Sequence, residues 1–405
     1  MVRPGATWHA TDMGGSERSP DVVVIGAGMV GAACAYYCSA AGLRVTVIER
    51  GAIAAGTTAA CEGNILLSDK EPGPELDLAL LSSRLWSEVA QDVGAGRLEY
   101  QRKGGVVVAA SRATADGLRQ LTARQRAAGI DAVDVSSGDV AGLEPHLTPD
   151  VVSGAYYPQD CQVQPMLAAA RLLQRARGRG ATVLTGTEAV GFVRDGRGTL
   201  TGVRTDSPTT PVIHTGRIVN ATGTWSGQTA GLAGAPVPVL PRRGFILVTE
   251  PLPRVIRHKV YTAEYVANVA SGDAGLESSV VVEGTRAGTV LIGASRERVG
   301  FDRSMSLPVL RTLAAQAIAV FPFLADVRLL RSYVGFRPYC PDHLPVIGAD
   351  PRAPGLLHAG GHEGAGIGLS AATGHLIAQV IAGTEPDLDL TPFRPDRFGE
   401  EVAAA

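Results

Sequence analysis

The 405-residue sequence predicts a mixed fold, α/β in its first domain and α+β overall, in which a parallel-sheet domain is interleaved with a domain built on an antiparallel sheet. Three observations lead to this prediction. A strand, a glycine turn, a helix and a second strand follow one another between residues 21 and 50. Glycine-rich segments return in the middle of the chain and near its end. The stretches between them are rich in strand-forming residues and have no phosphate-binding pattern.

The segment 21–50 organises the first domain. Its opening run, DVVVI, is β-branched and too short for a typical helix, so it suits a strand buried on both faces. Gly26, Gly28 and Gly31 follow at G-x-G-x-x-G spacing. A helix then leads to a second strand, RVTVI, which ends at Glu49. The first glycine permits the tight turn, the second lets a pyrophosphate approach the backbone, and the third lets the helix pack on the sheet.

This pattern predicts a Rossmann-like dinucleotide-binding unit. The phosphates are expected at unpaired N–H groups of the helix N-terminus, where the helix dipole favours negative charge. Glu49 lies about 20 residues beyond the glycines, where an acidic residue accepts hydrogen bonds from ribose hydroxyls. The uncharged stretch 22–43 is long enough to span a bilayer, but three glycines at this spacing after a strand argue against that. The glycines alone do not distinguish FAD from NAD.

Composition is that of an ordinary globular protein. The net charge is −2 and 45% of the residues are hydrophobic, with no basic stripe for nucleic acid and no acidic tail. The five cysteines form no metal-binding or disulfide pattern, so no metal site is predicted. Residues 1–20 are rich in Gly, Ser, Thr and charge and do not resemble a signal peptide. A disordered N-terminal extension and a cytoplasmic protein without a membrane span are therefore expected.

The alternation of two compositional styles predicts domains that are discontinuous in sequence. The nucleotide-binding domain is expected to comprise residues 21–72, 150–234 and 331–398, and the substrate-binding domain residues 73–149 and 235–330. Apolar spacing predicts helices over 74–93, 113–129, 166–180 and 307–321. Strands are expected over 104–109 and 289–295, with a hairpin formed by 188–194 and 200–205.

Three segments of small residues are candidates for ligand contact. Residues 51–70 form a loop at the carboxyl end of a parallel strand, where Thr57, Thr58 and Asn64 offer hydrogen bonds; a plain surface loop is the alternative. Residues 217–226 are predicted to be a buried strand that enters a glycine turn. Residues 360–369, GGHEGAGIGL, open a helix and offer a second set of free N–H groups.

Together these segments carry a family likeness. The order GAGMVGAACAYY, VIER, GTTAACEGN, QDCQVQP, NATGTWSG, GFRPYCPDHLPVIG and GGHEGAGIGLSAATG resembles the FAD-dependent D-amino-acid oxidase superfamily. It is most similar to the glycine oxidase, sarcosine oxidase and D-hydroxyproline dehydrogenase branch. The likeness covers residues 21–398. It implies FAD as the cofactor and a flavin domain beside a substrate domain whose sheet roofs the isoalloxazine ring.

The resemblance also implies roles for individual residues. The glycines of the first turn would hold the pyrophosphate, and Glu49 would meet the adenosine ribose. The helix-opening segment 360–369 would run beside the flavin ring, with backbone N–H groups stabilising negative charge at its N1–C2=O edge. The full cofactor-binding set is Gly26, Gly28, Met29, Val30, Gly31, Glu49, Arg50, Thr57, Thr58, Gly63, Asn64, Gly223, Trp225, Gly361, His362, Gly364, Ala365, Gly366, Ile367 and Gly368.

Arg337, in the GFRP motif, matches the arginine that binds the substrate carboxylate in glycine oxidase and D-amino-acid oxidase. A planar guanidinium can hold a carboxylate with two parallel hydrogen bonds. A structural ion pair is the alternative. Gly335 stands where monomeric sarcosine oxidase has the cysteine that binds FAD covalently, and Cys340 comes too late, so non-covalent FAD is expected. The lysine implicated in oxygen activation in sarcosine oxidase corresponds to a position near Leu291, where this chain has no lysine. An electron acceptor other than oxygen therefore stays open, although glycine oxidase also manages without that lysine.

The expected function is oxidation of an amino acid, or of a cyclic or secondary amino acid, at the carbon that bears nitrogen. Hydride would pass to flavin N5 and leave an imine. The alternative is the flavoprotein subunit of a dye-linked dehydrogenase complex, which passes electrons to a partner protein instead of oxygen. A non-catalytic FAD-binding protein is a third reading. The expected substrate carries a carboxylate, and both homo- and hetero-oligomers are left open.

Two tyrosines are candidates to close the substrate pocket. Tyr261 and Tyr265 could bond the carboxylate or the amine, and buried core tyrosines are the equal alternative. His258, Glu264 and Glu62 are weaker candidates for adjusting the protonation of the amine.

Overall fold

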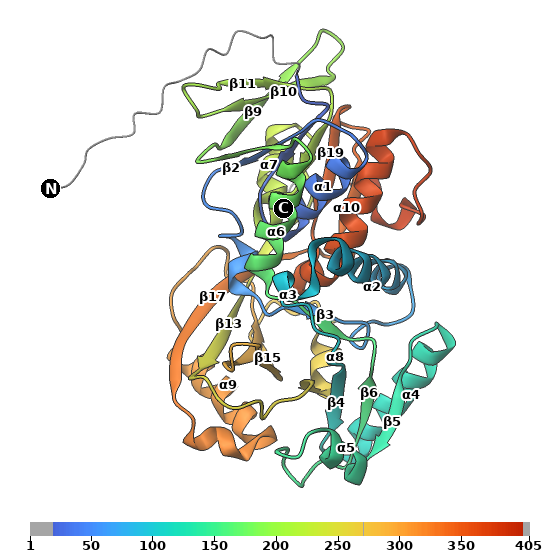
Figure 1. The fold of residues 1–405 in the computed structure, drawn as a ribbon, viewed down its shortest axis with the longest axis vertical. Helices are drawn as coiled ribbons and strands as arrows, with labels where there is room; N and C mark the ends of the chain where they lie inside the picture. Colours follow the sequence, from blue (N-terminus) through green and yellow to red (C-terminus); the bar gives the residue numbers. More distant parts are fainter. Residues whose placement is uncertain (1–18, 270, 400–405) are drawn as a thin grey trace, which may run out of the picture.

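A computed structural model describes residues 19–269 and 271–399 of the chain. The predicted N-terminal extension, residues 1–20, lies almost wholly outside the described residues. Two sheets dominate the structure, one in each half of the molecule as drawn in Figure 1, with α2 and β3 between them. The mixture of parallel and antiparallel sheets confirms the predicted fold class.

The first half is built on a six-stranded sheet in the order β18-β19-β12-β1-β2-β8. All neighbouring pairs are parallel except β18 and β19. The central strand β1 is fully buried, as its β-branched run predicts. The strands of this sheet are β1 (Val22–Ile25), β2 (Val45–Glu49), β8 (Thr182–Thr185), β12 (Ile218–Asn220), β18 (Val346–Ala349) and β19 (Leu356–Gly360).

Four helices pack together beside this sheet. They are α1 (Met29–Ala40), α2 (Pro74–Val93), α6 (Pro165–Gly178) and α10 (Gly366–Ala382). Trp86 of α2 is fully buried, and its indole N–H points at the carbonyls of Ile367 and Gly368, 3.1 and 3.2 Å away. Among the described residues, 363–382 is the one helical stretch long and apolar enough to cross a membrane. Because 67% of its most apolar window is buried inside the protein, it is best understood as a core helix.

The second half is built on an eight-stranded sheet in the order β17-β13-β16-β15-β14-β4-β6-β5. Its strands are β4 (Gly105–Ala109), β5 (Val133–Ser136), β6 (Ser153–Tyr157), β13 (Leu240–Thr249), β14 (Lys259–Thr262), β15 (Glu277–Gly284), β16 (Val290–Arg296) and β17 (Leu329–Tyr339). The predicted antiparallel sheet is antiparallel throughout except at β4–β14, which run parallel. One face packs on α9 (Leu307–Val320) through the fully buried Leu313 and Phe321.

The remaining elements complete the two halves. Antiparallel strands β9 (Ala189–Arg194) and β10 (Leu200–Thr205) form the predicted hairpin, which β11 (Val212–His214) extends to three strands. A two-stranded sheet pairs β3 (Asn64–Ile65) with β7 (Cys161–Gln162). The other helices are α3 (Ala95–Leu98), α4 (Arg112–Ala127), α5 (Ser137–Leu143), α7 (Ser226–Leu232) and α8 (Ala263–Val269).

Three elements, two strands and one helix, lie in the other half of the molecule from the one that the predicted division of the chain gives them. β17 pairs with β13 from Leu329 to Tyr339, so the expected boundary at residue 331 cuts through a strand of the eight-stranded sheet. β6 belongs to the same sheet, although residues 150–234 were assigned to the other domain. Conversely, α2 packs on α10 beside the six-stranded sheet, although residues 73–149 were assigned to the substrate-binding domain. Composition along the chain does not reveal strand pairing between distant segments, which is the reason for these differences.

A close helix contact offers a test of the packing. A Cβ added at Gly374 of α10 would lie 2.5 Å from the backbone carbon of Ala33 in α1, so even alanine forces a backbone to move. We expect Gly374→Ala to lower the free energy of unfolding by about 1–3 kcal/mol. Gly117→Ala, in the exposed middle of α4 where no atom lies within 4 Å, should raise it by up to about 1 kcal/mol. Denaturant unfolding of both variants checks this, and equal stability would contradict the packing.

Candidate active site

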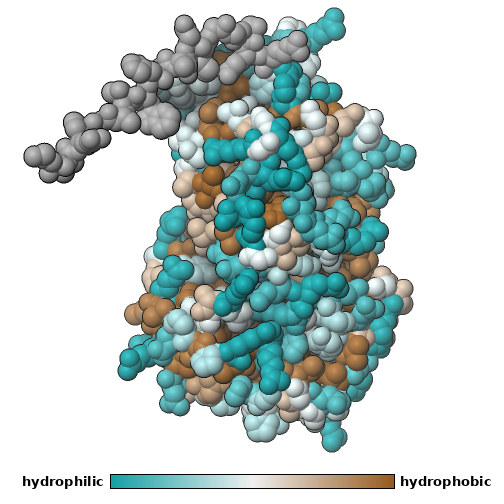
Figure 2. Space-filling model, in the orientation of Figure 1, coloured by the Kyte–Doolittle hydropathy of each residue, from teal (hydrophilic) through white to brown (hydrophobic). Residues whose placement is uncertain are grey.

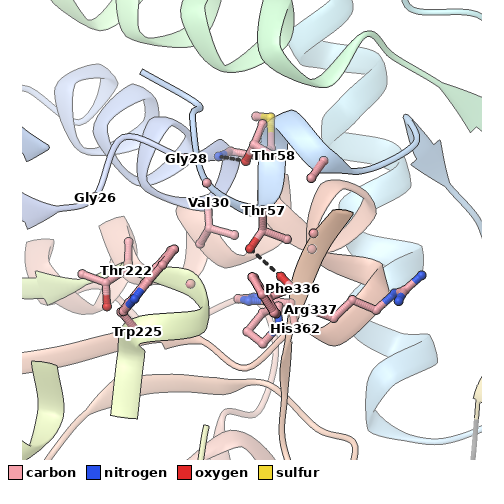
Figure 3. A pocket seen from close by; sticks show the side chains of 18 of the residues that line it. Gly26, Gly28, Val30, Thr57, Thr58, Thr222, Trp225, Phe336, Arg337 and His362 are labelled. Atoms are coloured by element: carbon pink, nitrogen blue, oxygen red, sulfur yellow. Dashed lines mark hydrogen bonds between the residues drawn. The ribbon is translucent and has the colours of Figure 1, made fainter. Parts of the chain in front are cut away.

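A cavity of about 590 Å³ lies between the two halves of the molecule. Its lining comes from the glycine turn after β1, the end of β2, two 3₁₀ turns at Thr57–Ala60 and Gly223–Trp225, the inner faces of β13 and β17, and the start of α10. A volume of this size is in the range of cofactor and small-molecule sites. Figure 3 shows its residues from Thr222 and Trp225 on one side to Arg337 on the other.

The glycine turn is held in place by side chains from two other segments. Glu49 at the end of β2 accepts a hydrogen bond from the N–H of Ala27 at 2.9 Å and another from the N–H of Gly51 at 2.9 Å. The hydroxyl of Thr58 accepts one from the N–H of Met29 at 3.0 Å. Thr58 therefore takes up one of the N–H groups at the start of α1 and leaves others there for a ligand.

Gly26 and Gly28 serve the turn in different ways. Gly26 has a φ of +106°, and a Cβ there would lie 2.5 Å from the carbonyl oxygen of Ala221 in the segment after β12. A Cβ at Gly28 would meet the Thr58 hydroxyl alone, at 3.3 Å, and would otherwise project into free space. Gly28 thus leaves room on the cavity side of the turn for a ligand backbone.

Trp225 forms part of the wall near the end of β2. The Arg50 guanidinium carbon lies 4.1 Å from the centre of its ring. Phe301, from the segment after β16, stacks on the same ring with centroids 5.4 Å apart and an angle of 12°. Segments from both halves of the molecule therefore meet at this aromatic side chain.

Hydrogen bonds of Thr57 connect the two halves of the molecule at the cavity. Thr57 donates to the carbonyl oxygen of Phe336 on β17 at 2.8 Å (Figure 3). Its hydroxyl also lies 3.0 Å from that of Thr224. This fixes the 3₁₀ turn at 57–60 against the sheet. The same 3₁₀ turn therefore contacts both β17, through Thr57, and the glycine turn, through Thr58.

The start of α10 presents backbone groups to the cavity. Gly364, Gly366 and Ile367 line it, and no side chain caps the helix, whose N-terminus therefore offers N–H groups and a positive dipole end. The His362 ring is 97% buried, with Nε2 2.9 Å from the Thr373 hydroxyl. Burial lowers the pKa of His362 to about 3, so the imidazole is neutral at physiological pH.

Arg337 provides the positive charge of the roof. Its Nη1 donates to the carbonyl oxygen of Ser295 at 2.7 Å. Burial, and then repulsion from Arg296, lower the pKa of Arg337 to about 10, which still leaves it charged at neutral pH. Within residues 19–269 and 271–399, no carboxylate lies within ion-pair distance of it. The roof beside it is made of Gly244, Ile246 and Gly335, and Tyr265 lies nearby on α8.

An acidic side chain lies near this roof. Glu62 lines the cavity and its Oε2 is 2.9 Å from Asn64 Nδ2 and 3.3 Å from Lys259 Nζ. Lys259 is 98% buried and also bonds Glu283 at 2.7 Å. Burial alone would lower the pKa of Lys259, but the two carboxylates raise it, so its ammonium stays charged.

Most of the predicted site residues meet at this cavity. The lining includes Gly26, Gly28, Met29, Val30, Glu49, Arg50, Thr57, Thr58, Asn64, Gly223, Trp225, Tyr265, Arg337, His362, Gly364, Gly366 and Ile367. Sequence reasoning missed the roof residues Gly244 and Ile246 and the Phe336 carbonyl. A glycine inside the strand LPRRGFILVT was the available signal, because it marks a close approach to a strand.

Six predicted residues do not line the cavity: Gly31, Gly63, Tyr261, Gly361, Ala365 and Gly368. Gly31 packs on the carbonyl of Gly26, and Gly63 on that of Val163, so both support the site from behind. Tyr261 is fully buried and donates to the Ser68 hydroxyl, which in turn bonds Asp160. It therefore belongs to the core between the halves.

Comparison with known families identifies the chain. Residues 21–380 match the model of the DAO family, described as FAD dependent oxidoreductase. The chain belongs to this family. It is an FAD-dependent oxidoreductase, and FAD is its cofactor.

Several relatives cover nearly the whole chain. Hydrogen cyanide synthase subunit HcnC of Pseudomonas aeruginosa is 28% identical over 96% of this chain and 98% of its own length. Glycine oxidase of Geobacillus kaustophilus is 28% identical over 92% and 96%. Its solved structure superposes with a TM-score of 0.84 at 26% identity, covering 94% of this chain and 99% of that one. L-proline dehydrogenase from P. horikoshii has a TM-score of 0.85 at 23% identity, covering 94% and 98%, which shows the shared fold.

The residues present fit FAD. The free space in front of Gly28 and the open start of α1 suit a pyrophosphate, and the uncapped start of α10 suits an electron-rich ring edge. Gly335 has no room for a side chain, since a Cβ there would lie 2.5 Å from that of Ala60. Cys340 does not line the cavity. Cys61 does, but burial raises the pKa of its thiol to about 12, which disfavours the nucleophilic thiolate.

Blocking the space in front of the glycine turn should remove the cofactor. We expect Gly28→Val to fold but to lose FAD on purification, because its side chain would occupy the approach of the pyrophosphate. Gly216→Val, at an exposed position with no atom within 4 Å, should retain FAD like the wild type. Flavin absorbance per protein measures retention and circular dichroism measures folding. A yellow Gly28→Val protein would show that the pyrophosphate binds elsewhere.

Proposed function

We propose that this protein oxidises the C–N bond of an amino acid, including N-substituted or cyclic ones, to an imine. The observation that carries the proposal is the Arg337 guanidinium, which is partly buried at the roof of the cavity and has no carboxylate of the described residues at ion-pair distance. A partly desolvated cation that lines a cavity without an ion-pair partner is costly, so an anionic ligand best explains its position. The glycine oxidase relatives support an amino acid as that ligand.

Arg337 is suited to fix both the position and the orientation of a carboxylate. One nitrogen is anchored by the Ser295 carbonyl, which holds the guanidinium plane and leaves its other N–H groups for the substrate. A carboxylate held by two points has its Cα at a defined place in front of the roof. Such positioning can supply a large part of the rate enhancement.

The other residues of the roof would exclude water and allow a close approach. Gly244 and Gly335 face each other in the register of β13 and β17, so no side chain projects from that pair. Ile246 and Phe336 supply apolar surface, and Tyr265, whose pKa is raised by burial, keeps a neutral phenol that can donate a hydrogen bond. When bound, FAD accepts the hydride from Cα. The bound coenzyme would be non-covalent, given the crowding at Gly335.

Removing the guanidinium tests the substrate assignment. We expect Arg337→Ala to retain FAD but to raise the KM for a carboxylated substrate by at least about 30-fold, since a buried charge pair of this kind is worth about 2–5 kcal/mol. Arg331→Ala, an exposed arginine on the same strand, is the matched control and should behave like wild type. Anaerobic bleaching of the flavin by a panel of D- and L-amino acids, sarcosine and hydroxyprolines provides the assay. If Arg337→Ala is bleached like the wild type, the protein still binds FAD, but the proposal that Arg337 binds the substrate carboxylate is wrong.

A second candidate function is that of a flavoprotein subunit within a larger complex. The HcnC relative is named as a subunit of hydrogen cyanide synthase. β17 is the outermost strand of its sheet, and Leu329 and Leu330 at its start are 49% and 61% exposed. Leu307, at the start of α9, is 62% exposed. Apolar residues are also visible between polar ones in the lower part of the face drawn in Figure 2. Exposed leucines beside a free strand edge are features of an interaction surface.

The electron acceptor distinguishes the two candidates. If the protein acts alone as an oxidase, amino-acid turnover in air should release one peroxide for each imine formed. A subunit that passes electrons onward should instead reduce an artificial dye much faster than oxygen. We expect the dye to be preferred, because the family lysine implicated in oxygen activation falls near Leu291, where this chain has no lysine, although glycine oxidase also manages without it. Stoichiometric peroxide at a rate equal to dye reduction would contradict this.

A further inference from the structure

Glu62 is a buried carboxylate whose hydrogen bonding is incomplete. Its side chain lines the cavity, yet the residue is 93% buried. Oε2 faces Asn64 and Lys259, whereas Oε1 is buried without any hydrogen-bond partner among the described residues. The amide oxygen of Asn64 is likewise buried without a donor. Both residues line the cavity, so a ligand that brings N–H donors would satisfy acceptors that the described residues leave without a partner.

The charges around Glu62 favour a cation there. Lys259 neutralises one of its two carboxylate partners, so the group of Glu62, Lys259 and Glu283 keeps a formal charge of −1. On the roof nearby, Arg337 is positive and has no ion-pair partner in the part of the chain that the structure describes. The titratable groups that act on or respond to Glu62 are Cys61, Lys259, Tyr265, Tyr333 and Arg337. A negative and a positive site in one cavity match the two ends of an amino-acid zwitterion.

The other acidic candidates are already engaged. Of the glutamates that line the described cavity, Glu49 accepts hydrogen bonds from the backbone N–H of Ala27 in the glycine turn and of Gly51 after β2, and Glu188 faces Arg50 at 3.6 Å. Glu363 lies 2.9 Å from His343 and 3.7 Å from Arg242. Of the sequence-predicted candidates, Glu264 is exposed and His258 bonds Glu144, away from the cavity. Glu363 Oε1 also lacks a hydrogen-bond partner among the described residues, but a basic side chain, His343, lies 2.9 Å from it, whereas Glu62 Oε1 has no basic side chain at ion-pair distance.

We infer that Glu62 binds the substrate ammonium and accepts its proton before oxidation. This inference rests on the proposed function and names the residue that prepares the amine. In the step, one N–H bond of the ammonium breaks, its electron pair stays on nitrogen, and the proton forms an O–H bond with Oε1 of Glu62. The freed lone pair then forms the C=N bond as hydride leaves Cα for FAD, the oxidant that the enzyme already carries. Asn64 and Lys259 act as positioning residues, because they hold Oε2.

The test compares Glu62→Gln with wild type across pH. Glutamine cannot take the proton, so only substrate that is already neutral reacts, and that fraction falls about tenfold per pH unit below the amine pKa. We expect the second-order rate of anaerobic flavin bleaching at pH 7 to drop on the order of 100-fold in Glu62→Gln. The ratio of wild-type to variant rates should shrink steadily as pH rises toward the pKa of the substrate amine. A ratio that stays constant with pH would overturn the inference.

Three further variants make the result specific. Glu62→Asp keeps a carboxylate and should recover the wild-type pH dependence. Glu264→Gln removes an exposed charge on α8 and should change nothing. Glu283→Gln removes the same charge from the buried group but leaves Glu62 in place, so an equal loss there would assign the effect to overall charge and overturn the inference.

A binding measurement separates this inference from the proposed function. Propionate, which has a carboxylate but no amine, should perturb the flavin spectrum with the same affinity in wild type and Glu62→Gln, while Arg337→Ala should lose that response. A folded Glu62→Gln protein that no longer retains FAD would assign Glu62 to the cofactor and overturn the inference. If no amino acid bleaches even the wild type, the proposed function itself fails. If bleaching is normal in both proteins, only the role of Glu62 is lost.

Discussion

The structure depends on the close approach of three backbone segments at the end of β1. Gly26 lies against the carbonyl of Ala221, and Gly31 of α1 lies against Gly26, so neither position accepts a side chain. This packing brings the start of α1 to the edge of the six-stranded sheet. Glu49 and Thr58 then fix the turn through backbone N–H groups. Everything in the cavity is placed relative to that turn, because the loop that carries Thr58 also carries the threonine that bonds β17.

Electrostatic pairing divides the buried charges of the molecule into two groups. Arg242 is fully buried with Glu277 and Glu363 close by, and Asp350 lies between Arg352 and His358. In such groups each charge has an oppositely charged side chain at ion-pair distance, and removing one partner would leave the other buried and uncompensated. Arg337 and Glu62 are different, because both line the cavity with incomplete pairing: no carboxylate of the described residues lies at ion-pair distance from Arg337, and Glu62 shares Lys259 with Glu283 while its Oε1 has no hydrogen-bond partner. Desolvated and incompletely paired charges are the usual mark of a site where a ligand completes the pairing.

Local patterns in the sequence were sufficient for the first domain. The β1–α1–β2 unit, the helix over Pro74–Val93 and the β9–β10 hairpin follow from side-chain periodicity and glycine placement within short windows. The domain boundaries did not follow, because the pairing of β17 with β13 joins segments about 90 residues apart in a way that no window contains. Tyr261 and Tyr265 show the same limit. They are four positions apart and chemically identical, yet one bonds Ser68 in the core and the other lines the cavity. The contact of Glu62 with Lys259 spans 197 positions, so only the folded chain reveals it.

The crowding at Gly335 has a consequence for how the holoenzyme behaves in dilute solution. With Ala60 packed against it, position 335 of the strand carries no side chain that could form a bond to the coenzyme. If FAD is held without a covalent bond, as we propose, the loaded fraction is set by mass action between protein and free flavin. Because the coenzyme binds the folded chain and not the unfolded one, its concentration also adds to thermal resistance, by RT ln(1 + [FAD]/Kd). Cellular flavin supply would therefore govern both how much of this protein is active and how long it survives.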